Sequence, residues 1–427
     1  MNYLALFSLS TLLLLTACGA DDSSPASIVY DEGEDIEISA DMIAKPRLAL
    51  GYNHSCFILN NDNKEVMCWG SNLQGQLGYG NKTEAEVEDE INNIDKLLTE
   101  EETEELLKNL YSSRPIIVRD SNKTHITGAI EISASENHTC ALLEGGNVKC
   151  WGSNSNWQLG NTELNTQHKQ ASSTAVDVNV ADLQGVKAIS VGNTYSCALL
   201  EAGDIKCWGK IPSGFSANNL LELTNKKPSQ LATASAHACV VTEDNQVQCW
   251  GDSSKLGHSE SEATEVTGID NALFVSSKGS HSCALLNNGR VRCWGSNLRG
   301  QIGNGDGGSV TSTVTIPSKN VINLSQVVSL SSGENYNCAV TQLGQVKCWG
   351  NNDNGQLGFT STGSYKQQFY PQVAASGIST AEEVSVSQNH SCARLKNDDV
   401  YCWGKNDRGQ LGNRTQKGSD EPVRVTF

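Results

Sequence analysis

The chain has 427 residues, of which 38% are hydrophobic and 19% are charged, and this balance excludes an intrinsically disordered chain. So many residues do not fit one ordinary core, so we expect a large assembly of repeats. The formal net charge of −17 excludes a sequence-independent grip on nucleic acid, because such binding needs a basic surface.

The first predicted element is a targeting signal over residues 1–17. Leu4–Leu15 is an apolar run of signal-peptide length, and the letters LTAC end it at Cys18. This ending resembles the lipobox of bacterial lipoproteins, and the resemblance implies that Cys18 becomes the lipidated N-terminus. It departs from the usual pattern because no Lys or Arg precedes the apolar run. An ordinary signal peptide with an incidental cysteine is the alternative.

Residues 18–45 are predicted to form a polar, acidic tether, with the letters GADDSSPAS and YDEGEDIE. No second long apolar segment follows, so we expect a protein that is anchored to a membrane and does not span it. Gly19 follows Cys18 where an Asp would favour retention in the inner membrane. The expected location is the bacterial cell envelope, at the outer membrane, on its periplasmic face or at the cell surface.

Seven cysteine pairs organise residues 46–427. The pairs are Cys56 with Cys68, Cys140 with Cys150, Cys197 with Cys207, Cys239 with Cys249, Cys283 with Cys293, Cys338 with Cys348, and Cys392 with Cys402. Trp-Gly follows each second cysteine, and successive first cysteines are 84, 57, 42, 44, 55 and 54 residues apart. Self-similarity at such a period is typical of a repeat architecture.

One repeat predicts three strands. Glu131–Leu143 contains two strands with a Ser-Glu-Asn break, and Asn147–Gly152 is a third strand after the turn EGGN. If Cys140 faces Cys150 across the hairpin, the two sulfurs lie on one face at disulfide distance. The spacing, the common face and an oxidising compartment therefore predict a disulfide in each hairpin. The first hairpin is two residues longer, and its register places Ile58 opposite Val66.

Zinc is the alternative for these cysteines, because a histidine stands two residues before most first cysteines. These histidines are His54, His138, His237, His281 and His390. Tyr195 and Tyr336 take this position in two repeats that keep both cysteines, and tyrosine is not a usual zinc ligand. We therefore expect disulfides, with no metal and no cofactor. The His/Tyr position is predicted to be a packed aromatic with one hydrogen-bonding end.

Trp-Gly is followed in five repeats by a loop that ends in Gln-Leu-Gly or Gln-Ile-Gly, such as SNLQGQLG at Ser71–Gly78. The phrase G-x-x-H-[ST]-x-A-L…G-x-V-x-x-W-G-x-N-x-x-G-Q-L-G resembles the repeat of the regulator of chromosome condensation 1 (RCC1) family over about residues 46–427. The resemblance implies an all-β fold, a seven-bladed β-propeller of four-stranded blades. The paired cysteines are not part of the family pattern and indicate adaptation to export.

Ring closure is predicted from strands that contain proline. Such strands, at Arg114, Lys227 and Tyr370, are predicted to open later units, and the chain ends with another at Glu421–Phe427. The first unit lacks a comparable strand. We therefore expect the C-terminal strand to complete the first blade and fasten the ring.

An acidic insertion, residues 83–113, follows the first repeat. Residues 79–113 carry eleven acidic residues and three lysines. Apolar residues at helical spacing and two capping-box patterns, Thr83 with Glu86 and Thr99 with Glu102, predict two short amphipathic helices. The insertion is either a solvated decoration of one rim or an arm that docks a partner.

Function is predicted to be binding and not catalysis. The chain contains no G-x-S-x-G, H-E-x-x-H or P-loop motif. The family implies protein partners, since its members include an exchange factor for a small GTPase, a light sensor and a secreted inhibitor of β-lactamase. The exchange-factor role needs a small GTPase, and we expect none outside the bacterial inner membrane. Light sensing in the family uses clusters of tryptophans, whereas only Trp157 is additional here to the seven tryptophans of the repeat. The favoured hypothesis is a scaffold for an unidentified protein partner. A structural or adhesive surface protein is the alternative, and an envelope enzyme is less favoured.

Overall fold

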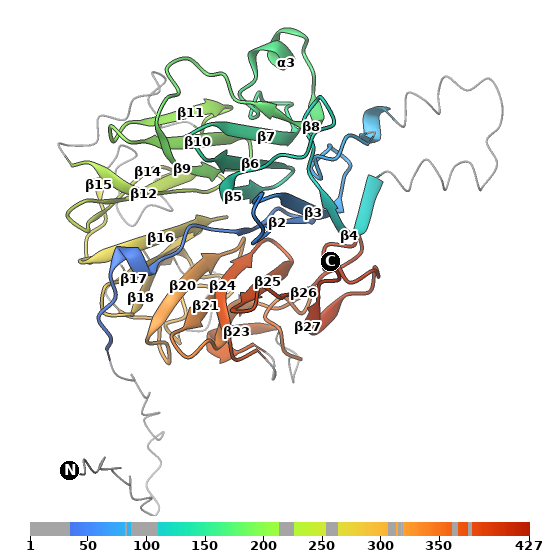
Figure 1. Ribbon diagram of the computed structural model, residues 1–427. Helices are drawn as coiled ribbons and strands as arrows, with labels where there is room; N and C mark the ends of the chain where they lie inside the picture. Colours follow the sequence, from blue (N-terminus) through green and yellow to red (C-terminus); the bar gives the residue numbers. More distant parts are fainter. Residues whose placement is uncertain are drawn as a thin grey trace, which may run out of the picture. The chain divides into compact units, whose positions relative to one another are not determined.

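The computed structural model describes residues 35–81, 83–86, 110–212, 226–252, 264–305, 313–314, 317, 319–360, 366–374 and 378–427. In these ranges the chain forms seven antiparallel sheets, which are the blades of a β-propeller (Figure 1). The predicted all-β, seven-bladed fold is thereby confirmed.

Each blade takes its strands from one continuous stretch of chain, in the order in which they occur. Blade 1 holds β1 (Leu48–Leu50), β2 (His54–Ile58), β3 (Val66–Ser71) and β4 (Tyr111–Ile117). Blade 2 holds β5 (Ala129–Ser135), β6 (His138–Leu143), β7 (Val148–Ser153) and β8 (Ala171–Asp177). Blade 3 holds β9 (Val186–Val191), β10 (Tyr195–Leu200) and β11 (Ile205–Gly209), and the described residues contain no fourth strand.

The remaining blades follow the same order. Blade 4 holds β12 (Pro228–Thr233), β13 (His237–Thr242), β14 (Val247–Gly251) and β15 (Thr264–Glu265). Blade 5 holds β16 (Ala272–Lys278), β17 (His281–Leu286), β18 (Val291–Ser296) and β19 (Thr313–Val314). Blade 6 holds β20 (Val327–Ser332), β21 (Tyr336–Thr341), β22 (Val346–Asn351) and β23 (Gln367–Val373), and blade 7 holds β24 (Ala381–Val386), β25 (His390–Leu395), β26 (Val400–Gly404) and β27 (Ser419–Arg424).

The central hairpins have the register that the sequence predicts. Cys140 pairs with Cys150 and Leu142 with Val148, and in the longer first hairpin Ile58 pairs with Val66. We call the side on which the second and third strands connect the hairpin face. We call the opposite side, on which the third and fourth strands connect, the loop face. Since strands alternate in direction, the chain enters the first strand of every blade from the hairpin face.

Helices are few in the described ranges. A 3-10 turn, η1, spans Ala40–Met42, and the helix α3 spans Thr162–Thr166. At the start of the acidic insertion the predicted capping box forms: the backbone N–H and the hydroxyl of Thr83 both donate to the Glu86 carboxylate, at 2.7 and 2.9 Å. The rest of the expected helices, including the box of Thr99 and Glu102, lies outside the described residues.

The predicted closure by the C-terminal strand is wrong. Blade 1 has its own first strand, β1, and β27 pairs with β26 inside blade 7. The strands at Arg114 and Tyr370, expected to open units, are the outer strands β4 and β23, whereas Pro228 does begin a first strand, β12. A proline lacks the backbone N–H and is tolerated at either edge of a sheet, so its presence does not distinguish a first strand from a fourth.

The core lies between the blades. One cluster of buried residues joins Ile58 and Val66 of blade 1 to Ile132 and Trp151 of blade 2. Another joins Leu48 and Trp69 of blade 1 to blade 7, including Leu411 and Val425. Side-chain packing of this kind, and not a sheet shared by both chain ends, closes the ring.

Candidate functional site

In five blades the tryptophan of the Cys-Trp-Gly frame ties its blade to the preceding one. Trp151 of blade 2 is fully buried, and its Nε1–H donates to the backbone oxygen of Gln76 in the loop of blade 1, at 2.9 Å. The equivalent pairs are Trp69 with Gln410, Trp208 with Gln158, Trp349 with Gln301 and Trp403 with Gln356. The Gln-Leu-Gly loop and the Cys-Trp-Gly frame are therefore two halves of one contact, made between blades.

The aromatic before each first cysteine makes a second contact, with the following blade. Nε2 of His138 lies 2.9 Å from Oγ of Ser196, which donates to the oxygen of Gln158 at 3.0 Å. The equivalent pairs are His54 with Thr139, His237 with Ser282, His281 with Asn337, Tyr336 with Ser391 and His390 with Ser55, while Tyr195 donates to the oxygens of Ala234 and His237. These contacts run from blade 1 through all seven blades and return to blade 1.

Burial favours the neutral form of several histidines in these contacts. Because the Ser196 hydroxyl gives its proton to a carbonyl oxygen, it accepts from Nε2–H of His138. Burial lowers the pKa of His138 and of His390 to about 3 and that of His281 to about 4. The His/Tyr position is thus a packed aromatic with one hydrogen-bonding end, as the sequence predicts.

The inner strands do not pair with one another, and side chains bridge them. Oγ of Ser133 accepts from the backbone N–H of Val191 at 3.1 Å, and Oγ of Ser190 accepts from that of Thr233 at 2.9 Å. Ser276 and Ser331 make the same bond to blades 6 and 7. Two residues earlier in the inner strand, nearer the hairpin face, a carboxylate or an amide takes the place of the serine. Glu131, Gln230 and Glu383 each accept a hydrogen bond from a backbone N–H of the next inner strand.

A cavity of about 770 Å³ lies between these inner strands, along the axis of the ring. Its hairpin-face mouth is crossed by residues 35–46, which we call the strap. Ile36 and Ile38 donate backbone N–H groups to Asn288 and Asn287 of blade 5, and the strap then reaches blade 1 at β1. Met42 and Ile43 of the strap line the cavity. Part of the segment expected to be tether is therefore bound to the ring.

The strap also compensates a buried carboxylate. Nζ of Lys45 lies 3.6 Å from Oε2 of Glu131, whose side chain is 7% exposed. Burial raises the pKa of Glu131 to about 7, against the opposing effects of the Ile189 N–H and of Lys45. The strap thus covers the cavity and stabilises the ionised form of Glu131.

Lys278 closes the other mouth of the cavity, at the loop face. Its position is occupied in other blades by small residues: Gly51, Ser135, Gly192, Ala234, Gly333 and Ser387. From blade 5 its Nζ reaches across to the oxygen of Leu50 in blade 1, at 2.9 Å, and lies 3.5 Å from that of Ala134 in blade 2. Burial lowers its pKa to about 8, although Glu334 opposes this shift.

Tyr52 lies over the same mouth. Its hydroxyl accepts from Nδ2 of Asn193 at 3.0 Å and lies 3.4 Å from Oε2 of Glu334. Burial and the charge of Glu334 raise the pKa of Tyr52, and burial and Glu334 also raise the pKa of Glu136. Tyr52 of blade 1, Asn193 of blade 3, Lys278 of blade 5 and Glu334 of blade 6 therefore meet at this mouth, beside Ala134 of blade 2. No local sequence pattern indicates this meeting, because the four side chains come from separate repeats.

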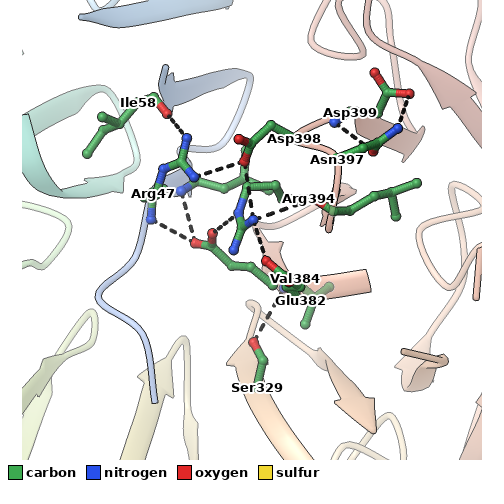
Figure 2. Close-up of polar contacts among 12 residues, drawn as sticks. Arg47, Ile58, Ser329, Glu382, Val384, Arg394, Asn397, Asp398 and Asp399 are labelled. Carbon is green, nitrogen blue, oxygen red and sulfur yellow. Dashed lines mark hydrogen bonds and ion pairs between the residues drawn. The ribbon is translucent and has the colours of Figure 1, made fainter. Parts of the chain in front are cut away.

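The junction of blades 7 and 1 carries a network of charged groups, and Figure 2 shows Arg47 and Arg394 converging on Asp398. Arg47 lies 2.8 Å from Asp398 and donates to the oxygen of Ile58, while its backbone N–H donates to Glu383. Arg394 is 6% exposed and pairs with Glu382 and Glu383 at 2.8 and 3.1 Å. This network joins the two terminal blades.

The structure contains seven disulfides, one in each central hairpin, and each joins the two cysteines of one repeat. The bonds join Cys56 with Cys68, Cys140 with Cys150, Cys197 with Cys207, Cys239 with Cys249, Cys283 with Cys293, Cys338 with Cys348, and Cys392 with Cys402. None of these bonds links different blades, so each disulfide stabilises its own hairpin, and the ring is held by the contacts between blades.

Metal binding finds no support in the side chains that are placed. Within the described ranges, no group of three or more His, Cys, Asp or Glu side chains is placed to hold a metal ion. The cysteines that zinc would need, Cys249, Cys293 and Cys348 among them, are bonded to sulfur instead. Cys18, the predicted lipidation site, and most of the acidic insertion lie outside the described residues.

Half of the chain, in segments spread from residue 47 to residue 427, matches a known repeat family. Residues 47–76, 129–158, 230–255, 274–301, 327–356 and 382–410 match a family described as Regulator of chromosome condensation (RCC1) repeat, and residues 344–394 and 397–427 match a second family with that description. The first set of matched segments covers the first strand and hairpin of six blades, and in five of them it extends to the glutamine of the Gln-Leu-Gly or Gln-Ile-Gly loop.

Relatives and solved structures agree with this match. The ultraviolet-B receptor UVR8 of Arabidopsis thaliana is 27% identical over 60% of this chain and 50% of that protein. The E3 ubiquitin-protein ligase HERC2 of Homo sapiens is 25% identical over 69% of this chain and 5% of that protein. The chain thus spans half or less of the length of these curated relatives. The crystal structure of Prp20p from Saccharomyces cerevisiae, at 20% identity, covers 92% of this chain and 90% of its own, with a TM-score of 0.68. The chain therefore belongs to the RCC1-repeat family and has that family's propeller fold.

Proposed function

We propose that this protein is an exported, lipid-anchored propeller of the bacterial cell envelope that binds a protein partner. The RCC1-like propeller is a protein-interaction scaffold fold, and the observation that carries this proposal is the ring itself. Its cavity is covered at one mouth by the strap and at the other by Lys278 and Tyr52, so recognition falls to the surfaces outside the cavity, the loops of the two faces and the outer edges of the blades.

Export is supported by the disulfides. A chain with seven cross-linked hairpins needs an oxidising compartment. The lipobox-like LTAC supports an anchor at Cys18, with residues 1–17 as signal peptide and the part of residues 18–45 that precedes the strap as the link between the lipid and the ring. No helix among the described residues is long and apolar enough to traverse a bilayer.

The anchor is tested by replacing Cys18 with Ser in the full chain. We expect the wild-type protein to fractionate with membranes, to carry a lipid mass on its N-terminal peptide and to be released only by detergent. The C18S protein should lack that lipid mass and should be recovered in the soluble fraction without detergent. Equal membrane association of both proteins would contradict the anchor and leave the propeller unaffected.

Binding is tested with the full chain in its own membrane. Chemical cross-linking followed by affinity isolation should recover the same protein partner at a fixed stoichiometry, and the recovered partner should bind the purified protein directly. A purified protein that binds no recovered candidate would contradict the scaffold function. Contacts restricted to further copies of the chain would favour the structural or adhesive alternative.

A further inference from the structure

Trp157 departs from the pattern of the repeat. It lies in the loop Ser153–Gly160 of blade 2, and its φ of 63° places a bulky residue in the left-handed region. Its side chain is 58% exposed, whereas the seven tryptophans of the repeat frame are at most 6% exposed. A backbone held in a costly conformation while it exposes an aromatic side chain points to a functional site.

Glycine occupies this position in the corresponding loops of four other blades. These residues are Gly75, Gly300, Gly355 and Gly409, with φ between 77° and 80°. A Cβ atom at each would lie between 2.5 and 2.8 Å from an atom of the fourth strand of the following blade. A larger side chain at this position and a fourth strand in the usual place therefore exclude each other.

The blade that follows Trp157 is blade 3, whose fourth strand is missing from the described residues. The loop of Trp157 packs on this blade, since Trp208 of β11 donates to the oxygen of Gln158 at 2.9 Å. Only eighteen residues separate β11 from β12, against twenty to fifty-seven between the same strands of the other blades. Blade 3 therefore has the least chain available for an outer strand.

The outer edge of β11 is unpaired in the described structure. Cys207 faces Cys197 with their Cα atoms 4.0 Å apart, which is the spacing of a non-hydrogen-bonded pair. The backbone N–H and C=O of Cys207 consequently point away from β10, toward the open edge. Cys207 and Trp208 are each 6% exposed, whereas the paired cysteines of the other blades are at most 1% exposed and the other frame tryptophans are fully buried.

We propose that the edge of β11, with Trp157 at its loop-face end, docks an extended segment of a partner protein, which adds to blade 3 as its fourth strand. The other blades show what this edge accepts: an antiparallel strand, hydrogen-bonded along its backbone. The indole of Trp157 then packs on the end of the added strand. This inference rests on the proposed scaffold function and identifies the kind of partner segment.

The fourth strands of blades 1, 2 and 7 also indicate a side-chain pattern for that segment. A valine or isoleucine lies opposite the second cysteine, and a serine lies opposite the glycine, four residues earlier. In each case the serine hydroxyl donates to the backbone oxygen two residues later, as Ser172 does to Thr174 at 2.7 Å. The expected partner segment carries serine four residues before a β-branched aliphatic residue.

The first experiment uses a synthetic peptide with the sequence of residues 170–179, which contains β8, and the intact full-length protein. Trp157 dominates the quencher-accessible fluorescence, because the other tryptophans are buried. We expect saturable binding that shields Trp157 from iodide and slows hydrogen exchange in Ile205–Gly209. The same peptide with prolines in place of Thr174 and Val176 should not bind.

The matched variant is Trp157→Gly, which restores the residue found in four other blades and relieves the left-handed strain. We expect unchanged or higher thermal stability and peptide binding at least tenfold weaker by calorimetry. Protection of Cys207 in the free protein, without peptide binding, would show that residues 213–225 cover the edge and would overturn the proposal. A natural partner that binds W157G as tightly as wild type would overturn it while leaving the scaffold function intact.

Discussion

At the scale of the residue, the position two before each first cysteine shows what spacing can predict. The substitution of Tyr for His in two repeats indicates a packed aromatic and argues against a metal ligand, and the buried rings of Tyr195 and Tyr336 agree. The partner was not predictable. His54 meets Thr139, which is 85 residues away, because the ring places the start of one second strand beside the start of the next. No local pattern encodes that distance.

The buried histidines predict a fold that weakens with acid. Burial lowers the pKa of His54 to about 3, with smaller contributions from Lys278 and His138. In the unfolded chain a histidine titrates near 6.5, so between these values the unfolded state binds more protons and stability falls as the pH falls. Each such histidine should make the free energy of unfolding about 2 kcal/mol lower at pH 5 than at pH 8.

The variant His54→Tyr tests this dependence, because Gly51 leaves room for a tyrosine ring as Gly192 does for Tyr195. Urea unfolding at pH 7.5 and pH 5.0 should show a smaller loss of stability in H54Y than in wild type. The same loss in both proteins would mean that His54 does not carry this effect.

At the scale of the element, register was predictable and strand order within a blade was not. Cys140 opposite Cys150 fixes a hairpin from local spacing alone. Proline strands such as β4 were assigned to the wrong edge, because a first and a fourth strand each have one unpaired side and proline satisfies both. The sequence did hold a sign that blade 3 differs from the others. Trp157 replaces the glycine that, in four other blades, leaves room for the fourth strand of the following blade.

The loop of blade 7 lies so close to β4 that adding a single methyl group to the loop should destabilise the fold. A Cβ on Gly409 would lie 2.6 Å from Cα of Ser113 in β4, whereas one on Gly145 would meet nothing closer than 4.0 Å. Both residues have positive φ, 77° and 84°, so the backbone penalty is shared. Gly409→Ala should destabilise the protein by at least about 1 kcal/mol more than Gly145→Ala. Equal melting temperatures would show that the strand yields without cost.

At the scale of the whole molecule, the number of blades followed from counting repeats, but the closure did not. A shared strand is one way to join the ends of a ring, and the sequence offered a candidate in Glu421–Phe427. The structure instead uses the same tryptophan and histidine contacts at the last junction as elsewhere, with Trp69 bonded to Gln410 and His390 beside Ser55. The strap was also unexpected, because its acidic composition indicated a tether.

The charged network between blades 7 and 1 predicts that breaking its Arg47–Asp398 pair destabilises the protein more than breaking the exposed Lys149–Asp177 pair. Arg47→Ala removes one of the two arginine partners of Asp398 and a donor to Ile58, and we expect the free energy of unfolding to fall by about 1–3 kcal/mol. Lys149→Ala breaks a pair with Asp177, whose side chain is 72% exposed, and should cost less than about 0.5 kcal/mol. Similar denaturation midpoints for the two variants would assign no special role to the junction.

Because every blade takes its described strands from one continuous stretch of chain and is held to its neighbours by side-chain contacts, no blade is obliged to come first. Circular permutation should therefore be tolerated: a gene that starts before β5 and ends after β4, with a short linker that joins the C-terminus directly to β1 and leaves out the strap, would still encode the same ring. The strap would then have to be supplied as a free peptide. Its affinity for that permuted ring would measure how tightly the hairpin-face mouth is sealed.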